Sequence, residues 1–200
     1  MASRESSLHV ALDDAEALRF LDSLALKLAS RGDIPKIIAR AQNDALKTAQ
    51  AEAVRAIREE YNAPAGKIKN AMTLKKARQR HLQAVLTLKG RMSVELIHYG
   101  ARPGKSGVTV KVLKSSRRSA IRPGGKQGIL ATKKRRVSAT WIAKGHVFAR
   151  VDDSENPIQR LWGPSFLTRL SNEDVRRRLE TRVRDRFTNR LRYYADQVLQ

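Results

Sequence analysis

The stretch that decides the fold class is HLQAVLTL, residues 81–88, because the period of the apolar residues changes there. Leu82, Ala84, Leu86 and Leu88 alternate with the residues between them, and this period of two is typical of a strand with one buried face. Further on, the alternation continues in residues 94–99 and 108–113, which predict two more strands. The apolar residues of WIAKGHVFARV, 141–151, predict a final hairpin, and GARPGKSG, 100–107, is expected to be a loop.

Towards the N-terminus the period is helical. Residues 12–31 predict a first helix, Asp33 caps a second helix that runs to about Tyr61, and AGKIKNAM, 65–72, predicts a short third helix. Small residues recur at every fourth position of the second helix, which lets another element approach its backbone closely. An ordinary core face explains this stripe, and packing on a neighbouring subunit is the alternative. The stripe comprises Ile34, Ile38, Ala41, Ala45, Ala49, Ala53 and Ile57.

Towards the C-terminus, one long helix is predicted from Asn172 to about Val198. Asn172 is the expected N-cap, and the acidic Glu173 and Asp174 suit the positive end of the helix dipole. The whole chain is therefore predicted to be α+β, with N-terminal helices, a small and mostly antiparallel sheet, a long basic loop and an Arg-rich C-terminal helix. The expected segments are a helical extension (1–32), an α+β core (33–171) with the basic loop 114–140, and the C-terminal helix (172–200).

The charge of the chain is strongly one-sided. Its 41 Lys and Arg against 19 Asp and Glu leave a net charge of +22. No acid occurs between Glu95 and Asp152, whereas Arg102 to Arg150 holds fourteen Lys and Arg. Such a run is either solvated and flexible or faces a polyanion, and nucleic acid and an acidic protein are the two candidate partners. The predicted contact residues are Arg117, Arg118, Arg122, Lys126, Lys133, Lys134, Arg135 and Arg136.

Two further stretches predict interfaces. The last helix carries eight Arg and no Lys from residue 176 to 192, and Arg is favoured where a guanidinium must fork onto a carboxylate or stack. Before it, NPIQRLWGPSFLTRL, 156–170, concentrates large apolar side chains around a Gly-Pro turn, and we call it the hook segment. The hook segment either packs on the protein's own sheet or anchors on the next subunit. The predicted interface residues are Pro157, Ile158, Leu161, Trp162, Gly163, Pro164, Phe166, Arg176, Arg177 and Arg184.

The sequence lacks the signals that are typical of several classes of function. The chain has no Cys, its four His are isolated, and it shows no Walker loop, zinc-finger ligand set or helix-turn-helix. GKSG, 104–107, lacks the glycine spacing of a phosphate-binding loop. No run of about 18 apolar residues predicts a membrane span, and the N-terminal residues lack the pattern of a secretory signal. We therefore expect neither an enzyme nor a cofactor, metal, membrane or small-molecule substrate.

The order of the motifs resembles a known family. An Ala-rich helix ending in IREEYN is followed by IHYGARPGKSGVTVKVLKSSRR, the basic loop, GHVFARV, and PIQRLWGPSFLTRL before an Arg-rich helix. This order is similar to that of the minor tail protein Z family of long-tailed phages, a tail completion family. Its late motif resembles P-I-x-x-L-x-G-P-S, and here Trp162 stands before Gly163 where Tyr is more common. The resemblance runs from about Asp33 to Leu170 or beyond.

The resemblance implies a structural virion protein that is assembled in the host cytoplasm. Such a protein acts late in tail assembly, at the neck end of the tail, and affects how DNA is placed in the joined particle. Its implied partners are further copies in a ring, by analogy a hexamer, together with the tail terminator or tail tube, the head connector and genomic DNA in the channel. The alternative, based on charge alone, is a free nucleic-acid-binding protein without sequence specificity.

Overall fold

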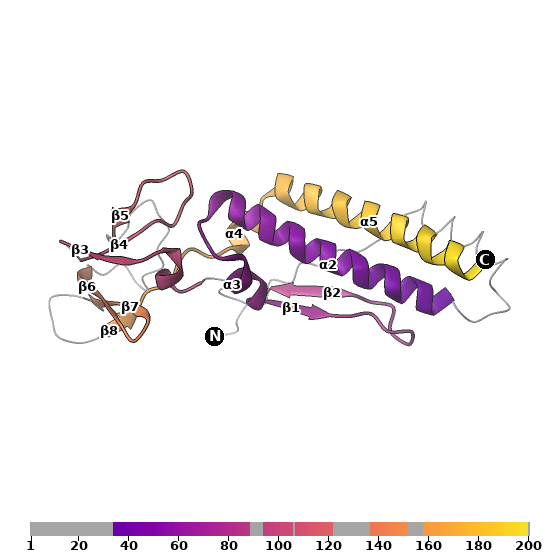
Figure 1. The fold of residues 1–200 in the computed structure, drawn as a ribbon, viewed down its shortest axis with the longest axis horizontal. Coiled ribbons are helices and arrows are strands. Elements are labelled where there is room, and N and C mark those ends of the chain that lie inside the picture. Colours follow the sequence, from indigo (N-terminus) through magenta and orange to yellow (C-terminus); the bar gives the residue numbers. More distant parts are fainter. Residues whose placement is uncertain (1–33, 89–93, 106, 122–136, 152–157, 200) are drawn as a thin grey trace. The chain divides into compact units, whose positions relative to one another are not determined.

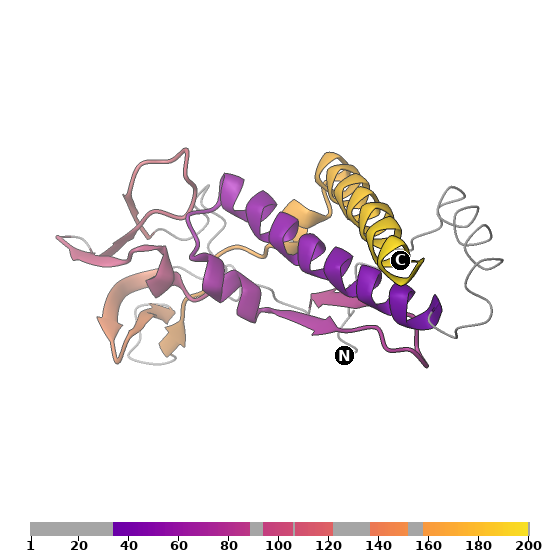
Figure 2. The same ribbon diagram turned by 45° about the vertical axis from the view of Figure 1, so that its right-hand side comes forward.

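The computed structural model describes residues 34–88, 94–105, 107–121, 137–151 and 158–199. Contacts within the chain divide it into two compact units, drawn in Figures 1 and 2. Unit 1 comprises Met1–Ala53, Met72–Gly90 and Ser171–Gln200, and unit 2 comprises Val54–Ala71 and Arg91–Leu170. Helices and small antiparallel sheets occur in the same chain, so the predicted α+β class is confirmed.

Two long helices dominate unit 1. The second predicted helix is confirmed as α2 (Ile34–Glu60), which unit 1 contains up to Ala53, and the C-terminal helix as α5 (Glu173–Leu199). The two helices lie side by side in both views (Figures 1 and 2). The predicted alanine stripe of α2 is buried, since Ala41, Ala45 and Ala49 are at most 3% exposed. Because alanine adds little bulk, this stripe permits close packing within the unit.

The sequence of α5 explains its start and its buried face. The backbone N–H groups of Asp174 and Val175 donate to Asn172 Oδ1 at 3.0 and 3.4 Å, so Asn172 is the predicted N-cap. The apolar side chains at helical spacing are buried, as in an amphipathic helix. They are Val175, Leu179, Val183, Phe187 and Leu191, and Ala195 extends the series by one turn.

Unit 1 also contains a β-hairpin that the sequence predicted only in part. β1 (Met72–Lys75) pairs antiparallel with β2 (Val85–Leu88), with Met72 opposite Leu88. β2 confirms the predicted strand but is shorter than residues 81–88. The predicted third helix was too long, because α3 (Ala65–Asn70) ends before Met72. Met72 buries its side chain in the hairpin instead, and β1 was not predicted.

A half-buried carboxylate joins the two helices of unit 1. Asp44 of α2 accepts a hydrogen bond from the Tyr194 hydroxyl at 2.8 Å and lies 3.3 Å from Arg190 Nε. Its side chain is 18% exposed. Burial alone would raise the pKa of Asp44, but the hydrogen bonds from Tyr194 and Lys47 and the charges of Lys47 and Arg190 lower it below the ordinary 3.8. The contact therefore stabilises the charged carboxylate in the folded state.

We expect Asp44→Asn to lower the free energy of unfolding by about 1.5 kcal/mol near neutral pH, because a partly exposed charged hydrogen bond is lost. A lowered folded-state pKa contributes stability above the unfolded value of 3.8. That contribution disappears as the pH falls through the folded-state pKa. Urea titrations from neutral pH downwards should show the two proteins converging in acid. A difference that persists or grows in acid would contradict this account.

One strand predicted in unit 2 is a helix in the structure. Residues 94–99 were expected to alternate as a strand, but Leu96–Tyr99 form a 3₁₀ helix, η1. Leu96 and Tyr99 are three residues apart, so one 3₁₀ turn puts both on the same side, and both are fully buried. Gly100 then ends the helix in the left-handed region at φ 66°. Burial of Leu96 and Tyr99 therefore decides the conformation of this segment, although its apolar residues also fit a period of two.

Two three-stranded antiparallel sheets complete unit 2. In the first, β3 (Arg102–Gly104), β4 (Gly107–Val110) and β5 (Ser119–Ala120) are neighbours in this order. The predicted loop 100–107 was therefore wrong in part, because it contains β3 and the start of β4. In the second, β6 (Val137–Ala143) and β7 (His146–Val151) form the predicted final hairpin, and β8 (Ile158–Arg160), which was not predicted, pairs with β7. The short helix α4 (Leu167–Leu170) follows.

Some predictions fall outside the described residues. They are the first helix at 12–31 and most of the basic loop (122–136). Within the described part of the loop 114–140, Ser119–Ala120 and the first residues of β6 are strands. None of the described helices combines the length and the apolar character that a membrane span requires.

Candidate interaction surfaces

The hook segment is hydrogen-bonded to the sheet of its own unit. The Leu161 N–H donates to Val147 O at 2.9 Å, and the Leu96 N–H donates to Leu161 O at 3.1 Å. Two residues later, the Gly163 N–H donates to Val94 O at 2.9 Å. The segment therefore runs between β7 and the residues that lead into η1, which supports the alternative in which it packs on the protein's own sheet.

The Gly-Pro turn of the hook segment packs against the aromatic ring of Tyr99. A Cβ placed on Gly163 would lie 2.7 Å from both Cζ and the hydroxyl oxygen of Tyr99, and closer still to Cε2. Only glycine lets the backbone approach a ring this closely. Tyr99 belongs to the YGAR block, residues 99–102, and Gly163 to the P-I-x-x-L-x-G-P-S motif of the hook segment, so the structure joins two sequence motifs in one contact.

The hydroxyl of Tyr99 lies deep in unit 2. Tyr99 is fully buried, and its hydroxyl has no hydrogen-bond partner among the described residues. Burial raises the pKa of Tyr99 well above its ordinary value, and the nearby Tyr61 adds to the shift. The ring therefore serves as a neutral packing surface for the turn at Gly163.

We expect Tyr99→Phe to leave the stability unchanged or to raise it by about 1 kcal/mol, because an unpaired buried hydroxyl costs desolvation free energy. The ring that contacts Gly163 is retained in this variant. Chemical denaturation of both proteins measures the difference. A loss of stability would show that the hydroxyl has a partner that stabilises the fold.

The predicted interface residues of the hook segment divide into buried and exposed sets. Leu161 and Phe166 are at most 2% exposed, and the Phe166 ring centroid lies 5.6 Å from that of Tyr61. Pro164 is buried as well. Ile158 and Trp162 are 49% and 39% exposed, so they are the members that a partner could reach. Pro157 lies outside the described residues.

Among the predicted contacts of the basic loop, the structure describes Arg117 and Arg118. Both are exposed, but Arg118 also has a role in the fold. Its guanidinium donates to Gly100 O and, at 3.4 Å, to Thr109 O, so it joins the end of η1 to β4. The others lie in the part of the chain that is not described, namely Arg122, Lys126, Lys133, Lys134, Arg135 and Arg136.

The predicted arginines of α5 lie on its exposed side. Arg176 and Arg177 pair with Glu180 and Glu173 at 3.4 and 3.3 Å, each at i,i+4 spacing. Exposed pairs of this kind contribute only a few tenths of a kcal/mol. Arg184 is exposed too and has an interaction of its own. The structure does not bring these residues together with the hook segment in one unit.

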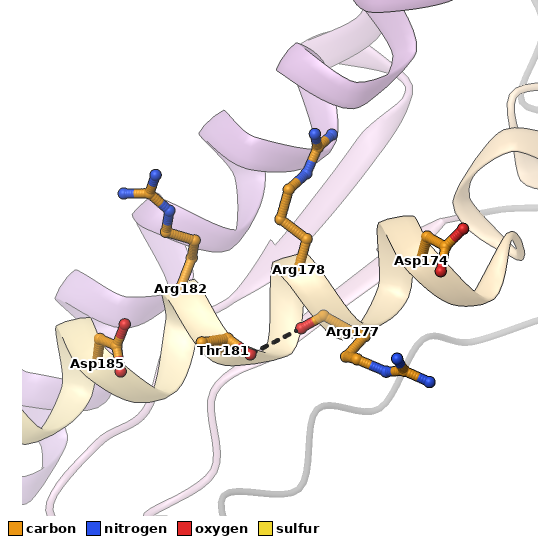
Figure 3. Close-up of a pocket in the computed structure, with 6 residues that line it drawn as sticks. All are labelled: Asp174, Arg177, Arg178, Thr181, Arg182 and Asp185. Carbon is orange, nitrogen blue, oxygen red and sulfur yellow. Dashed lines mark hydrogen bonds between the residues drawn. The ribbon is translucent and has the colours of Figure 1, made fainter.

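A hollow of about 310 Å³ lies along the first half of α5. Figure 3 shows Arg178 and Arg182 extending to one side of the helix and Arg177 to the other, while Thr181 donates to Arg177 O at 3.0 Å. The described residues that line the hollow include three arginines with an aspartate at either end, so it offers guanidinium groups to an anion only beside carboxylates. They are Asp174, Arg177, Arg178, Thr181, Arg182 and Asp185.

Sequence reasoning found only part of one surface, the outer face of the β6–β7–β8 sheet, because it predicted Ile158 and Trp162 as interface residues but not the side chains beside them. Trp141, Phe148 and Arg160 form a single cross-strand row, while Val147 and Ala149 point into the core. The alternation within β6 and β7 could have placed Trp141 and Phe148 on one face. Arg160 could not be added from the sequence, because β8 has only three residues. We call Trp141, Phe148, Arg150, Ile158, Arg160 and Trp162 the aromatic–arginine face.

One carboxylate lies at the edge of this face. Glu95 pairs with Trp162 in an isolated antiparallel bridge, and its carboxylate contacts His146 Nδ1 and lies 3.9 Å from Arg160. Nearby, burial and the charge of Lys67 lower the pKa of His98 below its ordinary value. In the described residues no three His, Cys, Asp or Glu side chains gather as a metal site would require. What these surfaces offer is apolar contact and guanidinium groups, which suits binding.

Comparison with known protein families gives a match over most of the chain. The family model described as prophage minor tail protein Z (GPZ) matches residues 15–200. Neither the curated proteins nor the solved structures contain a match to this chain. The family match includes the hook segment, the YGAR block and α5, and extends beyond the 33–170 range of the sequence resemblance. Since it covers nearly the whole chain, the protein belongs to the prophage minor tail protein Z family.

Proposed function

We propose that this phage tail protein is a subunit of a ring, by analogy a hexamer, that completes the tail at the end that joins the head. The observation that carries the proposal is the family membership, which implies a virion component with a structural role in the tail. In this role the protein contacts further copies of itself, the tail terminator or tail tube, and the head connector.

The charge distribution supports a position in contact with polyanions. The 56 residues from Leu96 to Val151 contain no acid, and the exposed Arg117 lies in this stretch. A ring of such subunits concentrates positive charge, which a compact particle tolerates only beside negative charge. We propose that the basic loop 114–140 faces genomic DNA in the channel or an acidic surface of a neighbouring ring.

The proposal predicts a fixed copy number in purified particles. Mass spectrometry of particles from an induced lysogen should detect the chain in constant ratio to the other tail proteins, and electron cryomicroscopy of the neck should show it as a ring. A chain that is absent from particles, and whose affinity for duplex DNA falls steeply with salt, would favour the free nucleic-acid-binding protein instead.

We expect charge reversal in the basic loop to impair assembly or DNA retention without unfolding the protein. Changing Lys133, Lys134, Arg135 and Arg136 to Glu should lower the yield of infectious particles about tenfold or more, because like charges then meet at the contact. A matched control reverses four exposed cations of other segments. These are Lys69, Lys75, Lys76 and Arg78. Equal yields from both variants would refute a specific role for the loop.

A further inference from the structure

The aromatic–arginine face combines large apolar side chains with exposed cations. Ile158 and Trp162 are 49% and 39% exposed, whereas Val147 and Leu161 on the opposite face are at most 2% exposed. Trp141 on β6 and Phe148 on β7 are half-buried and stack with ring centroids 6.1 Å apart. Trp and Arg are the residues that most often dominate binding free energy at protein interfaces.

The arginines of this face are held on the aromatic rings. The guanidinium carbon of Arg150 lies 5.9 Å from the Trp141 ring centroid, and that of Arg160 lies 6.0 Å from the Phe148 ring centroid. A guanidinium held over a ring keeps N–H groups available at its edge, and less side-chain entropy is lost when an anion binds. Carboxylates and phosphates are the anions that fit this planar fork.

The aliphatic part of the face favours a protein over a nucleic acid. Ile158 is the most exposed of the large apolar side chains in the described residues, and it has no π system on which a base could stack. A sugar–phosphate backbone would leave this side chain uncovered. A protein surface can bury Ile158 and Trp162 and place carboxylates at Arg150 and Arg160 at the same time.

Several described acids of a second copy are already paired within their own chain. Glu59 and Glu60 lie 3.7 and 3.3 Å from Arg169 of the same unit. On α5, Glu173 and Glu180 are paired with Arg177 and Arg176. With a net charge of +22, two copies meeting at this face would bring cations against cations. An acidic partner therefore complements this face better than a second copy does.

We propose that the aromatic–arginine face docks an acidic protein other than this chain, through a surface that sets carboxylates beside apolar side chains. The proposed function does not say which face meets a neighbouring protein. The inference rests on that function only in expecting this partner among the other proteins of the tail.

Site-specific photo-crosslinking tests the inference. p-Benzoylphenylalanine replaces Ile158 in the full chain, and cells of the induced lysogen are irradiated during assembly. We expect an adduct with a different protein, and mass spectrometry should place it on a peptide that contains Asp or Glu. Adding Arg150→Glu should lower the adduct yield about tenfold, because a carboxylate then faces carboxylates.

Two matched controls make the result specific. Arg102→Glu makes the same charge change on an exposed residue of β3. It should alter the adduct yield at Ile158 less than about twofold, because an exposed charge away from the contact has little effect. The crosslinker at Leu82, which is 39% exposed, should not give the same adduct. Thermal unfolding of each variant should stay within about 2 °C of wild type.

The inference is overturned if the crosslinker at Ile158 captures a second copy of the chain or DNA. It is also overturned if the crosslinker at Ile158 gives no adduct other than those that the crosslinker at Leu82 gives. A third contrary result is an adduct yield at Ile158 that Arg150→Glu leaves unchanged. These outcomes are separable from failure of the proposed function. If the chain is absent from purified particles, the ring proposal fails, yet an Arg150-dependent adduct in cells with an acidic protein still supports the docking face.

Discussion

Gly163→Ala is expected to lower the free energy of unfolding by about 3 kcal/mol, at the upper end of the cost of overpacking a core. The added methyl group would lie 2.7 Å from Cζ of Tyr99, a fully buried ring that has no room to move away. The backbone cannot retreat easily either, because the Gly163 N–H is bonded to Val94 O at 2.9 Å. Urea denaturation of the variant and the wild-type protein measures the loss.

A second glycine provides the control for this substitution. A Cβ placed on Gly66, in helix α3, would have no atom within 4 Å. Gly66→Ala should therefore be neutral, or stabilise the protein by up to about 1 kcal/mol, because alanine favours the helix. If Gly163→Ala is as stable as Gly66→Ala, the packing of Gly163 on Tyr99 is not the reason for glycine at this position.

Phe166→Ala is expected to cost about 4 kcal/mol, since it removes a fully buried ring and leaves a cavity. The ring packs on Tyr61 at 5.6 Å between centroids, and the Phe166 backbone carbonyl accepts a hydrogen bond from the Leu170 N–H at 3.1 Å. The loss should therefore appear as unfolding or poor expression of the protein by itself, before any assembly is measured.

Trp162→Ala should behave differently from Phe166→Ala, although both residues belong to the hook segment. Trp162 is 39% exposed, so we expect the isolated protein to lose only about 1 kcal/mol. Its effect should fall on incorporation into particles, if the aromatic–arginine face meets a partner. Thermal unfolding and particle composition, measured on the same two variants, separate the two roles. A Trp162→Ala protein that folds and assembles fully would refute a docking role for this ring.

Periodicity predicted the long elements well. The second helix and the C-terminal helix were recognisable because each repeats a buried stripe over many turns, and Asn172 begins α5 as expected. The hairpin of β6 and β7 was likewise apparent from its alternating apolar residues. In these elements the local pattern and the tertiary packing demand the same conformation, so the sequence alone is informative.

The short elements were less predictable, for physical reasons. η1 spans one turn, and its two buried residues fit a strand pattern as well as a 3₁₀ turn. β3 and β8 have three residues each, which is too short for a period of two to be recognised. Their conformation depends on pairing with the neighbouring strands β4 and β7, which three residues by themselves do not reveal.

The candidate sites show the same division. Charge and composition predicted contacts or interfaces at Arg117, Arg118, Arg176, Arg177 and Arg184, and in the structure these five side chains are exposed. The sequence could not separate Trp162 from Phe166, because only the sheet register decides which side chain faces inward. It also could not show that Arg118 supports the carbonyl of Gly100, since that contact joins residues 18 positions apart.

The contact between Tyr99 and Gly163 has a consequence for how sequences of this family diverge. The two positions are 64 residues apart but share one small volume, so a change at either alters what the other tolerates. Relatives with a smaller residue at position 99 could admit alanine or serine at 163, whereas those that retain a large ring should retain glycine. Substitutions at the two positions should therefore be inherited as pairs across the family.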